Sequence, residues 1–369
     1  MKDLDKYRGC LMGGAVGDAL GYAVEFLDAN DIFKQYGRNG ITEYCLVNGV
    51  ARISDDTQMT LFTANGLLFG TTRGMNRGIM ADYPNYICAC YQDWLRTQTE
   101  QFPLDEKSVT SWLVNVPALF SRRAPGTTCI EAIKRGGNGT INAPINNSKG
   151  CGGIMKVAPI GLYFEDKPYT LDRIDMIGAE TAALTHGHEL GYIPAAVLVH
   201  IIHLVAHSKN ISLLDAVIEA KEASKKLFPN AKYLTDFISI MNKAIALSAE
   251  EISDLEAIKQ LGEGWVAEET LAIAIYCALK YPNDFEKAIV ASVNHSGDSD
   301  STGAVTGNIM GAYLGLSDIP SKYLEKLELK EVILELADDL FQDCKMEEYS
   351  MYKDEVWESK YIYKTYHYG

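Results

Sequence analysis

The segment Gly9-Cys-Leu-Met-Gly-Gly-Ala-Val-Gly-Asp-Ala-Leu-Gly21 has a glycine at every fourth position near the start of the chain. The same spacing recurs near the end, in Gly303-Ala-Val-Thr-Gly-Asn-Ile-Met-Gly-Ala-Tyr-Leu-Gly315. Each glycine costs a helix about 1 kcal/mol relative to alanine, so glycines repeated in this way need a compensating interaction. Positions four apart form one ridge of a helix, and a ridge without side chains lets another backbone approach closely. The two stripes therefore predict tightly buried, central helices.

The rest of the chain also carries helical periodicity. Alternating runs of β-branched residues, which are typical of strands, are nearly absent. Helices are expected at about 8–27, 54–70, 80–99, 107–122, 169–185, 189–208, 212–227, 232–248, 251–261, 265–281, 284–294, 301–315 and 328–345. Connections rich in Gly, Asn and Pro fall at 28–52, 123–130 and 135–153, and none is long or biased enough to be an interdomain linker. The sequence predicts an all-α fold, a compact single domain over residues 1–369.

The composition is that of an ordinary globular protein with an acidic surplus. Of the 369 residues, 47% are hydrophobic and 22% are charged, which argues against a disordered, collagen-like or coiled-coil chain. The 49 acidic and 34 basic residues give a formal net charge of -15. This charge disfavours a nucleic acid as partner. It permits a small phosphorylated ligand, because backbone N–H groups and a bound cation can reverse the potential within one pocket.

The cysteines and the N-terminal residues favour a reduced, cytoplasmic protein. The eight cysteines are scattered, and Cys88 and Cys90 form a CxC motif instead of CxxC, so we expect packing cysteines and no structural zinc site. The first residues, MKDLDKYRG, lack the basic and then apolar pattern of a signal peptide. No uninterrupted apolar stretch approaches the roughly 20 residues of a membrane helix, so no membrane partner is expected.

Two clusters of oxygen-bearing residues each precede a predicted helix, namely Ile53-Ser-Asp-Asp-Thr-Gln-Met-Thr60 and His295-Ser-Gly-Asp-Ser-Asp-Ser-Thr-Gly303. Helix capping explains each cluster taken alone, since Ser and Asp side chains accept hydrogen bonds from the first N–H groups and acids favour the positive end of the helix dipole. Taken together, the four carboxylates would repel one another unless they are separated or bridged by cations. If the clusters meet, hard oxygen ligands without Cys or His suit Mg²⁺, Mn²⁺ or Ca²⁺, and a two-ion magnesium or manganese site follows.

Two other interpretations of the second cluster fail on the sequence. An EF-hand loop that starts at Asp298 requires Glu at its twelfth position, which is Ile309. A dehalogenase-type DxDxT motif should follow an apolar strand, whereas residues 288–293 continue a helix in a chain without a parallel-sheet pattern.

With both clusters in view, the chain resembles the ADP-ribosylglycohydrolase family, which includes the dinitrogenase reductase-activating glycohydrolase and the ADP-ribosylhydrolases. The resemblance spans nearly the whole chain and keeps the order of the family's motifs. These motifs are Gly13-Gly-Ala-Val-Gly-Asp-Ala-Leu-Gly-Tyr-Ala-Val-Glu25, Ser54-Asp-Asp-Thr57, Arg123-Ala-Pro-Gly-Thr-Thr128, Gly150-Cys-Gly-Gly-Ile-Met-Lys-Val-Ala-Pro159, Thr185-His186, Trp265-Val-Ala-Glu-Glu269 and Asn294-His-Ser-Gly-Asp-Ser-Asp-Ser-Thr-Gly303. The resemblance implies an orthogonal helical bundle with a central metal cleft.

The resemblance also implies two divalent cations, Mg²⁺ or Mn²⁺, in that cleft. The family's metal ligands fall on Ser54, Asp55, Asp56, Asp298, Asp300 and Ser301. The family more often has Thr at the last of these positions, and Ser keeps the hydroxyl. The implied reaction is hydrolysis of the glycosidic bond at the anomeric carbon of an ADP-ribosylated side chain, through an oxocarbenium-like centre. Its implied catalytic residues are Glu25, in an acid/base or gating role, with Asp55, Asp56 and Asp300.

Substrate contacts are implied at a glycine-rich loop and at a histidine. The loop residues that match the family's phosphate-binding loop are Gly150, Cys151, Gly152 and Gly153. Exposed N–H groups of such a loop can cradle a diphosphate. Some relatives carry Asn in place of Cys151 and Arg in place of Lys156, which leaves the detailed contacts open. His186 matches a histidine near the ribose and phosphates, and Tyr192 is a further candidate on the same segment.

Other residues with suggestive patterns are expected to be structural. His200, His203 and His207 share one face of an aliphatic helix, but the stretch holds no acid and no HExxH motif. Glu268 and Glu269 follow a family pattern and are taken as structural. Cys151 is not expected to be a nucleophile, because no base is identifiable nearby. The aromatic segment 357–368 is expected to pack against the protein.

The expected function is removal of ADP-ribose from a protein side chain, with arginine as the first candidate, which reverses mono-ADP-ribosylation. The expected partners are an ADP-ribosylated protein as substrate, ADP-ribose as product, and an ADP-ribosyltransferase whose modification is reversed. Three alternatives stay open: a non-catalytic ADP-ribose-binding or crystallin-like relative, a hydrolase of serine-linked or small-molecule ADP-ribose conjugates, and a phosphoesterase for a small nucleotide.

Overall fold

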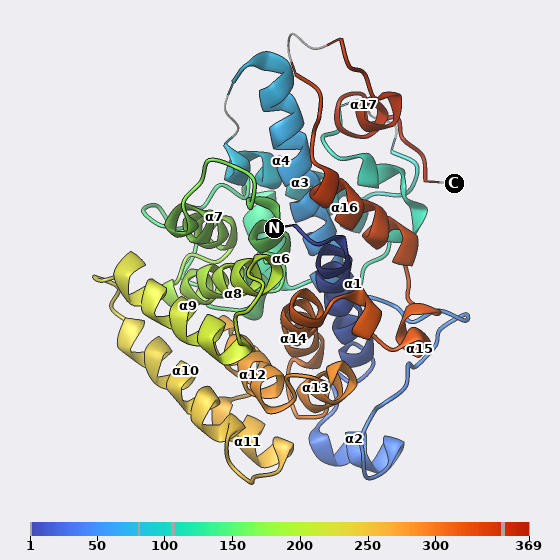
Figure 1. The fold of residues 1–369 in the computed structure, drawn as a ribbon. Coiled ribbons are helices and arrows are strands. Elements are labelled where there is room, and N and C mark those ends of the chain that lie inside the picture. The colour runs from blue at the N-terminus through green and yellow to red at the C-terminus, as the bar shows by residue number, and fades with distance from the viewer. Residues whose placement is uncertain (1, 80–81, 105–107, 348–350, 369) are drawn as a thin grey trace.

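Two antiparallel helices cross the middle of the molecule. The computed structural model describes residues 2–79, 82–104, 108–347 and 351–368. Helix α1 (Leu4–Gly21) lies against α14 (Ser299–Leu314), at the centre of Figure 1. A β-carbon built on Gly13 would lie closer than 3.0 Å to the carbonyl oxygen of Gly307, and one built on Gly307 would lie equally close to that of Gly13. The glycine stripes predicted to allow a close approach therefore face each other.

The remaining helices surround this pair. In chain order they are α2 (Ala29–Tyr36), α3 (Asp55–Arg77), α4 (Tyr83–Thr99), α5 (Thr127–Lys134), α6 (Ala158–Tyr163), α7 (Leu171–Ala183), α8 (Glu189–His207), α9 (Leu213–Leu227), α10 (Leu234–Ser248), α11 (Asp254–Leu261), α12 (Ala267–Lys280), α13 (Phe285–Val293), α15 (Ser321–Leu324), α16 (Lys330–Gln342) and α17 (Glu355–Tyr361). The described residues contain only isolated β-bridges and no strand. The all-α prediction is confirmed.

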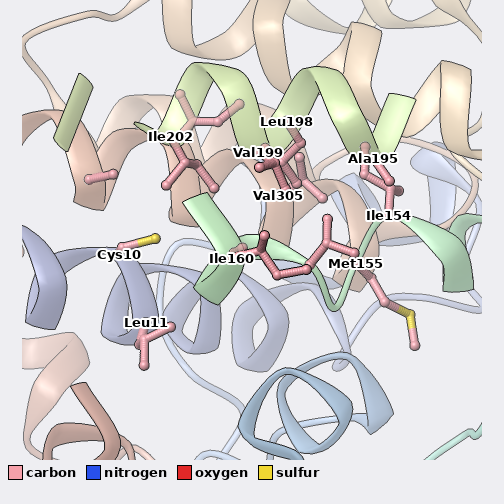
Figure 2. Close-up of a cluster of buried hydrophobic side chains, with 14 of the residues drawn as sticks. Cys10, Leu11, Ile154, Met155, Ile160, Ala195, Leu198, Val199, Ile202 and Val305 are labelled. Carbon is pink, nitrogen blue, oxygen red and sulfur yellow. The ribbon is translucent and has the colours of Figure 1, made fainter. Parts of the chain in front are cut away.

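The buried apolar side chains form one connected core around the central pair. Figure 2 shows a part of it, where Leu11 of α1, Ile160 of α6, Leu198 of α8 and Val305 of α14 are drawn together. All four side chains are almost completely buried. Helix α8 contacts α6, α7, α9, α12 and α14, so it joins the central pair to the outer helices.

Helix α8 corrects one expectation from the sequence. It is 19 residues long with a mean hydropathy of 1.7, so by length and composition it is apolar enough to cross a membrane, and it is the one such helix among the described residues. The structure buries 89% of this segment inside the protein. Its apolar surface is therefore used as core surface, and its continuous hydrophobicity reflects contacts on all sides.

The long predicted helices are present, but one prediction is wrong. Residues 107–122, of which 107 lies outside the described residues, form no α-helix and instead hold the short 3-10 turns η1 (Trp112–Asn115) and η2 (Pro117–Leu119). Pro117 has no N–H and disfavours helical backbone at the preceding residue, which explains the break. The first two residues of the helix expected at 80–99 also lie outside the described part of the chain.

Several short helices were not predicted from the sequence. They are α2, α5, α6, α15 and α17, none longer than 8 residues. Two turns or fewer give the apolar periodicity too few repeats to stand out from a loop.

The residues expected to be structural have structural contacts. His200 Nδ1 lies 2.7 Å from Asp175 Oδ2, and His207 Nε2 lies 3.0 Å from the carbonyl oxygen of Leu162. Trp357 is buried and its Nε1 donates to Thr72 Oγ1 at 2.9 Å, so this part of the C-terminal aromatic segment packs down as expected. All eight cysteines are free, in agreement with a reduced chain.

Replacing Gly307 by alanine should destabilise the protein strongly. The added methyl group meets the backbone of α1, which cannot move aside as a flexible side chain could. We expect a loss of about 3 kcal/mol in the free energy of unfolding, at the upper end of overpacking costs, measured by urea denaturation. Gly126→Ala is the matched control, because a β-carbon there meets nothing within 4 Å. Equal stability of both variants would contradict the close contact of α1 and α14.

Acid should weaken the fold at the His207 site. Burial, with His203 as the next cause, lowers the pKa of His207 from 6.5 to about 4. The unfolded chain therefore binds a proton between these values that the folded chain does not, so stability falls as the pH drops from about 6.5 to about 4. We expect this residue to contribute a loss of roughly 2–3 kcal/mol across that window.

The test compares urea unfolding of the wild type and His207→Gln at pH 7 and pH 4.5. Glutamine can still donate to the Leu162 carbonyl but does not titrate, so the variant should show a shallower loss of stability on acidification. Parallel losses in the two proteins would exclude this origin.

Candidate active site

The two oxygen-rich clusters, far apart in the sequence, line one pocket of about 220 Å³. Both stand at helix starts, the first at α3 and the second at α14, and residues of both contribute to the pocket wall. The lining residues are Glu25, Asp55, Asp56, Ala124, Gly126, Thr127, Thr128, Cys129, Gly150, Cys151, Gly152, Met155, His186, Trp265, Asp298, Asp300 and Ser301. Ser54 and Gly153 are buried and do not line the pocket, although each is next in the chain to a residue that does.

The first cluster is held by a buried acid that sequence reasoning did not single out. Asp18, on α1, accepts hydrogen bonds from the N–H of Ser54 at 2.9 Å and from the N–H of Thr57 at 3.1 Å, and also from the Thr57 hydroxyl. Ser54 caps α3 by accepting from the N–H of Asp56 at 3.2 Å. Asp55 Oδ2 accepts from the N–H of Gly126 at 3.2 Å. The sequence signal for Asp18 was its position as the one acidic residue within the glycine stripe of α1.

The second cluster combines a helix cap with a thiol contact. Asp298 Oδ1 accepts from the N–H of Ser301 at 3.2 Å, as an N-cap of α14, and Asp300 Oδ1 accepts from the same N–H at 3.0 Å. The Cys151 thiol donates to Asp298 Oδ2 at 2.8 Å. Burial, with Asp298 as the next cause, raises the pKa of Cys151 well above its usual value. The thiol is therefore protonated at neutral pH, which agrees with the expectation that it is not a nucleophile.

The pocket brings several buried carboxyl groups close together. Burial, reinforced by neighbouring carboxylates, raises the pKa of Glu25 to about 9 and that of Asp55 to about 8. Burial likewise raises the pKa of Asp56 and of Asp300 well above the usual range, with Asp55 and Asp56 respectively as the next cause. Burial therefore makes ionisation of these carboxyl groups unfavourable, and bound cations would make it favourable again.

The donor atoms suit hard cations, although the carboxylates do not converge on one point as they stand. Glu25 Oε2 and Asp56 Oδ2 are buried without a hydrogen-bond partner, and oxygen donors are those that Mg²⁺ and Mn²⁺ prefer. A hydrogen bond from the Ser301 side chain lowers the pKa of Asp56, which links the two clusters directly. Within the ranges that the structure describes, no three His, Cys, Asp or Glu side chains are grouped closely enough to hold an ion without rearrangement.

The glycine-rich loop forms another part of the pocket lining and contacts the second cluster through Cys151. Gly150 and Gly152 line the pocket, and Gly152 packs so closely on His186 that a β-carbon would lie 2.9 Å from its Cε1 atom. The N–H of Cys151 donates to the carbonyl oxygen of Trp265 at 3.1 Å, and that of Gly153 donates to the carbonyl oxygen of Gly150 at 3.3 Å. These two N–H groups already have acceptors within the protein, so the loop is a less open cradle than the sequence suggested.

A second helix start supplements the loop. Thr127 and Thr128, in the first turn of α5, line the pocket, and α5 was not predicted from the sequence. The N–H groups of a helix start favour anions, so this turn adds to the phosphate-compatible wall.

His186 is oriented by a buried chain of polar groups. Lys156 is fully buried, and its Nζ donates to Thr185 Oγ1 at 2.6 Å. Thr185 Oγ1 in turn lies 2.9 Å from His186 Nδ1. Burial, with Lys156 as the next cause, lowers the pKa of His186 well below 6.5, so the imidazole is neutral at physiological pH. Lys156 therefore acts behind the pocket and does not itself line it.

One expected contact is absent from the pocket lining. Tyr192 is buried on α8, with its ring 5.9 Å from that of Phe228, and does not line the pocket. Its role as a substrate contact stays a prediction from the sequence. A larger cavity of about 610 Å³ lies elsewhere, lined by residues such as Phe33, Arg38 and Lys287, and it lacks the paired acid clusters.

The helical bundle and its pocket define an all-α protein with a carboxylate-lined site. The chain belongs to the ADP-ribosylglycohydrolase family, because the family's model matches residues 1–349. The resemblance seen in the sequence is thereby confirmed over nearly the whole chain.

Individual relatives agree with this assignment. An Archaeoglobus fulgidus protein is 28% identical over 345 residues, which cover 92% of this chain and 96% of that protein. The ADP-ribosyl-[dinitrogen reductase] glycohydrolase of Rhodospirillum rubrum is 26% identical over 330 residues, with coverages of 88% and 91%. The ADP-ribosylarginine hydrolase Tri1 of Pseudomonas putida is 25% identical over 340 residues, with coverages of 92% and 78%. A solved ADP-ribosylglycohydrolase-related protein complex superposes with a TM-score of 0.57 at 25% identity, with coverages of 92% and 98%.

Replacing Asp18 by asparagine should loosen the first cluster. An asparagine offers one acceptor oxygen where three donors now meet, and its amide group opposes the rest. We expect a loss of ~2–4 kcal/mol in the free energy of unfolding. Asp172→Asn is the control, because Asp172 forms an exposed ion pair with Lys226. Unchanged stability of Asp18→Asn would show that the Ser54–Thr57 turn holds its shape without this carboxylate.

Proposed function

We propose that the protein hydrolyses the glycosidic bond between ADP-ribose and a modified protein side chain, with arginine as the preferred acceptor. The observation that carries the proposal is the meeting of two acid clusters and a glycine-rich loop in one pocket, in a chain of this family. The relative named for ADP-ribosylarginine supports the acceptor. ADP-ribosylated protein is then the substrate, ADP-ribose is a product, and the protein reverses the work of an ADP-ribosyltransferase.

We assign the ligands of two divalent cations, Mg²⁺ or Mn²⁺, to Ser54, Asp55, Asp56, Asp298, Asp300 and Ser301. When bound, such ions neutralise the carboxylates, orient ribose hydroxyls and make a water more acidic. The unpartnered oxygens of Glu25 and Asp56 and the absence of soft ligands among these six residues support hard cations. Cys151 is the soft group nearest to them, and its thiol is kept protonated by burial.

The chain's own residues divide the substrate between two walls. The diphosphate is assigned to the first turn of α5 and to Gly152 of the loop, because the N–H groups of Gly150, Cys151 and Gly153 already have acceptors. His186 offers a neutral ring nitrogen beside them. The acidic wall, which consists of Glu25, Asp55, Asp56, Asp298 and Asp300, is assigned to the ribose and its anomeric carbon. This division puts carboxyl oxygens next to the oxocarbenium-like centre, where their partial negative charge stabilises the transition state.

The chemical step is a balanced hydrolysis. The bond from the anomeric carbon to the guanidine nitrogen breaks, a bond from that carbon to a water oxygen forms, and one proton of the water passes to the leaving guanidine. Glu25 is the residue we assign to proton handling, because its carboxyl group faces the pocket, is buried, and has one oxygen without a partner. No electron carrier is required, since both bonds are broken and formed as electron pairs.

The proposal predicts ADP-ribose release from arginine-modified protein that requires a divalent cation. Chelation should abolish release, and Mg²⁺ or Mn²⁺ should restore it. Asp55→Ala and Asp300→Ala should each lose at least roughly 100-fold in kcat/KM, because each removes a charged ligand from the acidic wall. Release is measured by chromatography of free ADP-ribose, and Asp172→Asn is the control for an exposed acid remote from the pocket.

The same assay separates the other functions. Binding of ADP-ribose without release from any conjugate would identify a non-catalytic relative. Release from serine-linked and not arginine-linked peptides would change the acceptor, and release of inorganic phosphate from a nucleotide would indicate a phosphoesterase. Equal rates for the wild type and both aspartate variants would overturn the two-ion assignment. Cytoplasmic location stays a prediction from the sequence.

A further inference from the structure

Two exposed aromatic rings stack on each other beside the acidic wall. Phe26 is 74% exposed and Trp265 is 40% exposed. Their ring centroids lie 6.5 Å apart and their planes differ by 23°. Single exposed aromatics are normal on protein surfaces, but a stacked pair next to a pocket is the arrangement found at binding sites.

The pair is built into the pocket on both sides. Trp265 lines the pocket, and its carbonyl oxygen accepts the Cys151 N–H of the glycine-rich loop. Phe26 directly follows Glu25, whose carboxyl group lines the same pocket. The Trp265 backbone is thus held by the glycine-rich loop, while the side chain of Phe26 is mostly exposed and that of Trp265 is partly exposed.

The charge around the rings selects a planar cation. The exposed Glu263 stands two residues before Trp265 in the chain. The carbonyl oxygen of Glu263 accepts the N–H of Asp298 at 2.8 Å, which ties this segment to the second acid cluster. An aromatic face attracts a cation within about 6 Å of its centre, and guanidinium stacks on such faces better than ammonium does. A neutral nucleobase would gain the stacking alone, whereas a guanidinium group gains both stacking and charge attraction.

We propose that Phe26 and Trp265 bind the guanidinium group of the acceptor arginine and so make the enzyme prefer arginine-linked over hydroxyl-linked ADP-ribose. This inference rests on the proposed function and deepens it. The two rings are specificity residues at the mouth of the pocket. The carboxylates of the acidic wall remain responsible for the reaction.

The kinetic test uses Phe26→Leu and Trp265→Leu, which keep an apolar side chain but remove the aromatic face. Each variant should raise KM for an arginine-linked ADP-ribosyl peptide roughly tenfold, with kcat within about twofold of the wild type. The inhibition constant of free ADP-ribose and the kcat/KM for a serine-linked peptide should change much less than the KM for the arginine-linked peptide. Tyr363→Leu is the matched control, because Tyr363 is also an exposed aromatic residue, 62% exposed and outside the pocket.

Two results would overturn the inference. An unchanged KM for the arginine-linked peptide would remove any role of the rings in acceptor binding. Parallel weakening of ADP-ribose inhibition would assign the rings to adenine. Circular dichroism and the urea midpoint of each variant must match the wild type, so that a folding defect is recognised as such.

A binding measurement separates this inference from the proposed function. Titration of the wild type with N-acetyl-arginine amide should quench tryptophan fluorescence saturably, and Trp265→Leu should lose that signal. N-acetyl-citrulline amide, which is planar but neutral, should bind more weakly. If these results hold while no conjugate is hydrolysed, the proposed function fails and the guanidinium site stands. If arginine and citrulline amides behave alike, the guanidinium site fails whatever the enzyme hydrolyses.

Discussion

The backbone contact between α1 and α14 is the constraint on which the rest of the structure depends. Because the two helices are antiparallel, the end of α1 meets the beginning of α14: a β-carbon on Gly21 would collide with the carbonyl oxygen of Ser299. The residues that follow α1, including Glu25, are thereby brought beside Asp298 and Asp300. Asp18, one turn earlier, holds the first acid cluster from the same helix. The glycine contacts that pack α1 against α14 thus also bring the residues of the acidic wall together.

The acidic wall carries an electrostatic cost that the protein reduces only in part. Backbone N–H groups and a capped helix start stabilise individual carboxylates, such as Asp55 and Asp298, yet burial still raises the pKa of Asp55 to about 8. Groups kept in so unfavourable a state are typical of sites where function sets the requirement. A neighbouring part of the pocket has the other polarity, with the start of α5 and the buried Lys156 behind His186. One pocket therefore offers an anion-binding side and a cation-binding side to a single ligand.

Much of this arrangement could be predicted from the sequence, and the failures have physical reasons. The glycine stripes, the long helices and both acid clusters are local patterns, so residue spacing alone gave them. The partner of each stripe, the contacts of Asp18 and the stacking of Phe26 on Trp265 depend on residues far apart in the chain, which spacing does not reveal. Short helices such as α5 hold too few repeats to be recognised, and Pro117 broke a segment whose periodicity favoured a helix.

The pairing of α1 with α14 also sets the order in which the molecule can be completed during synthesis. Helix α1 leaves the ribosome long before α14, whose glycines at residue 303 and beyond it packs against. Contacts of such sequence separation form slowly and leave apolar surface uncovered meanwhile. Until α14 has been translated, α1 lacks the helix that it packs against in the folded protein. We therefore expect the protein to depend on chaperones for folding, and we expect C-terminally truncated chains to aggregate.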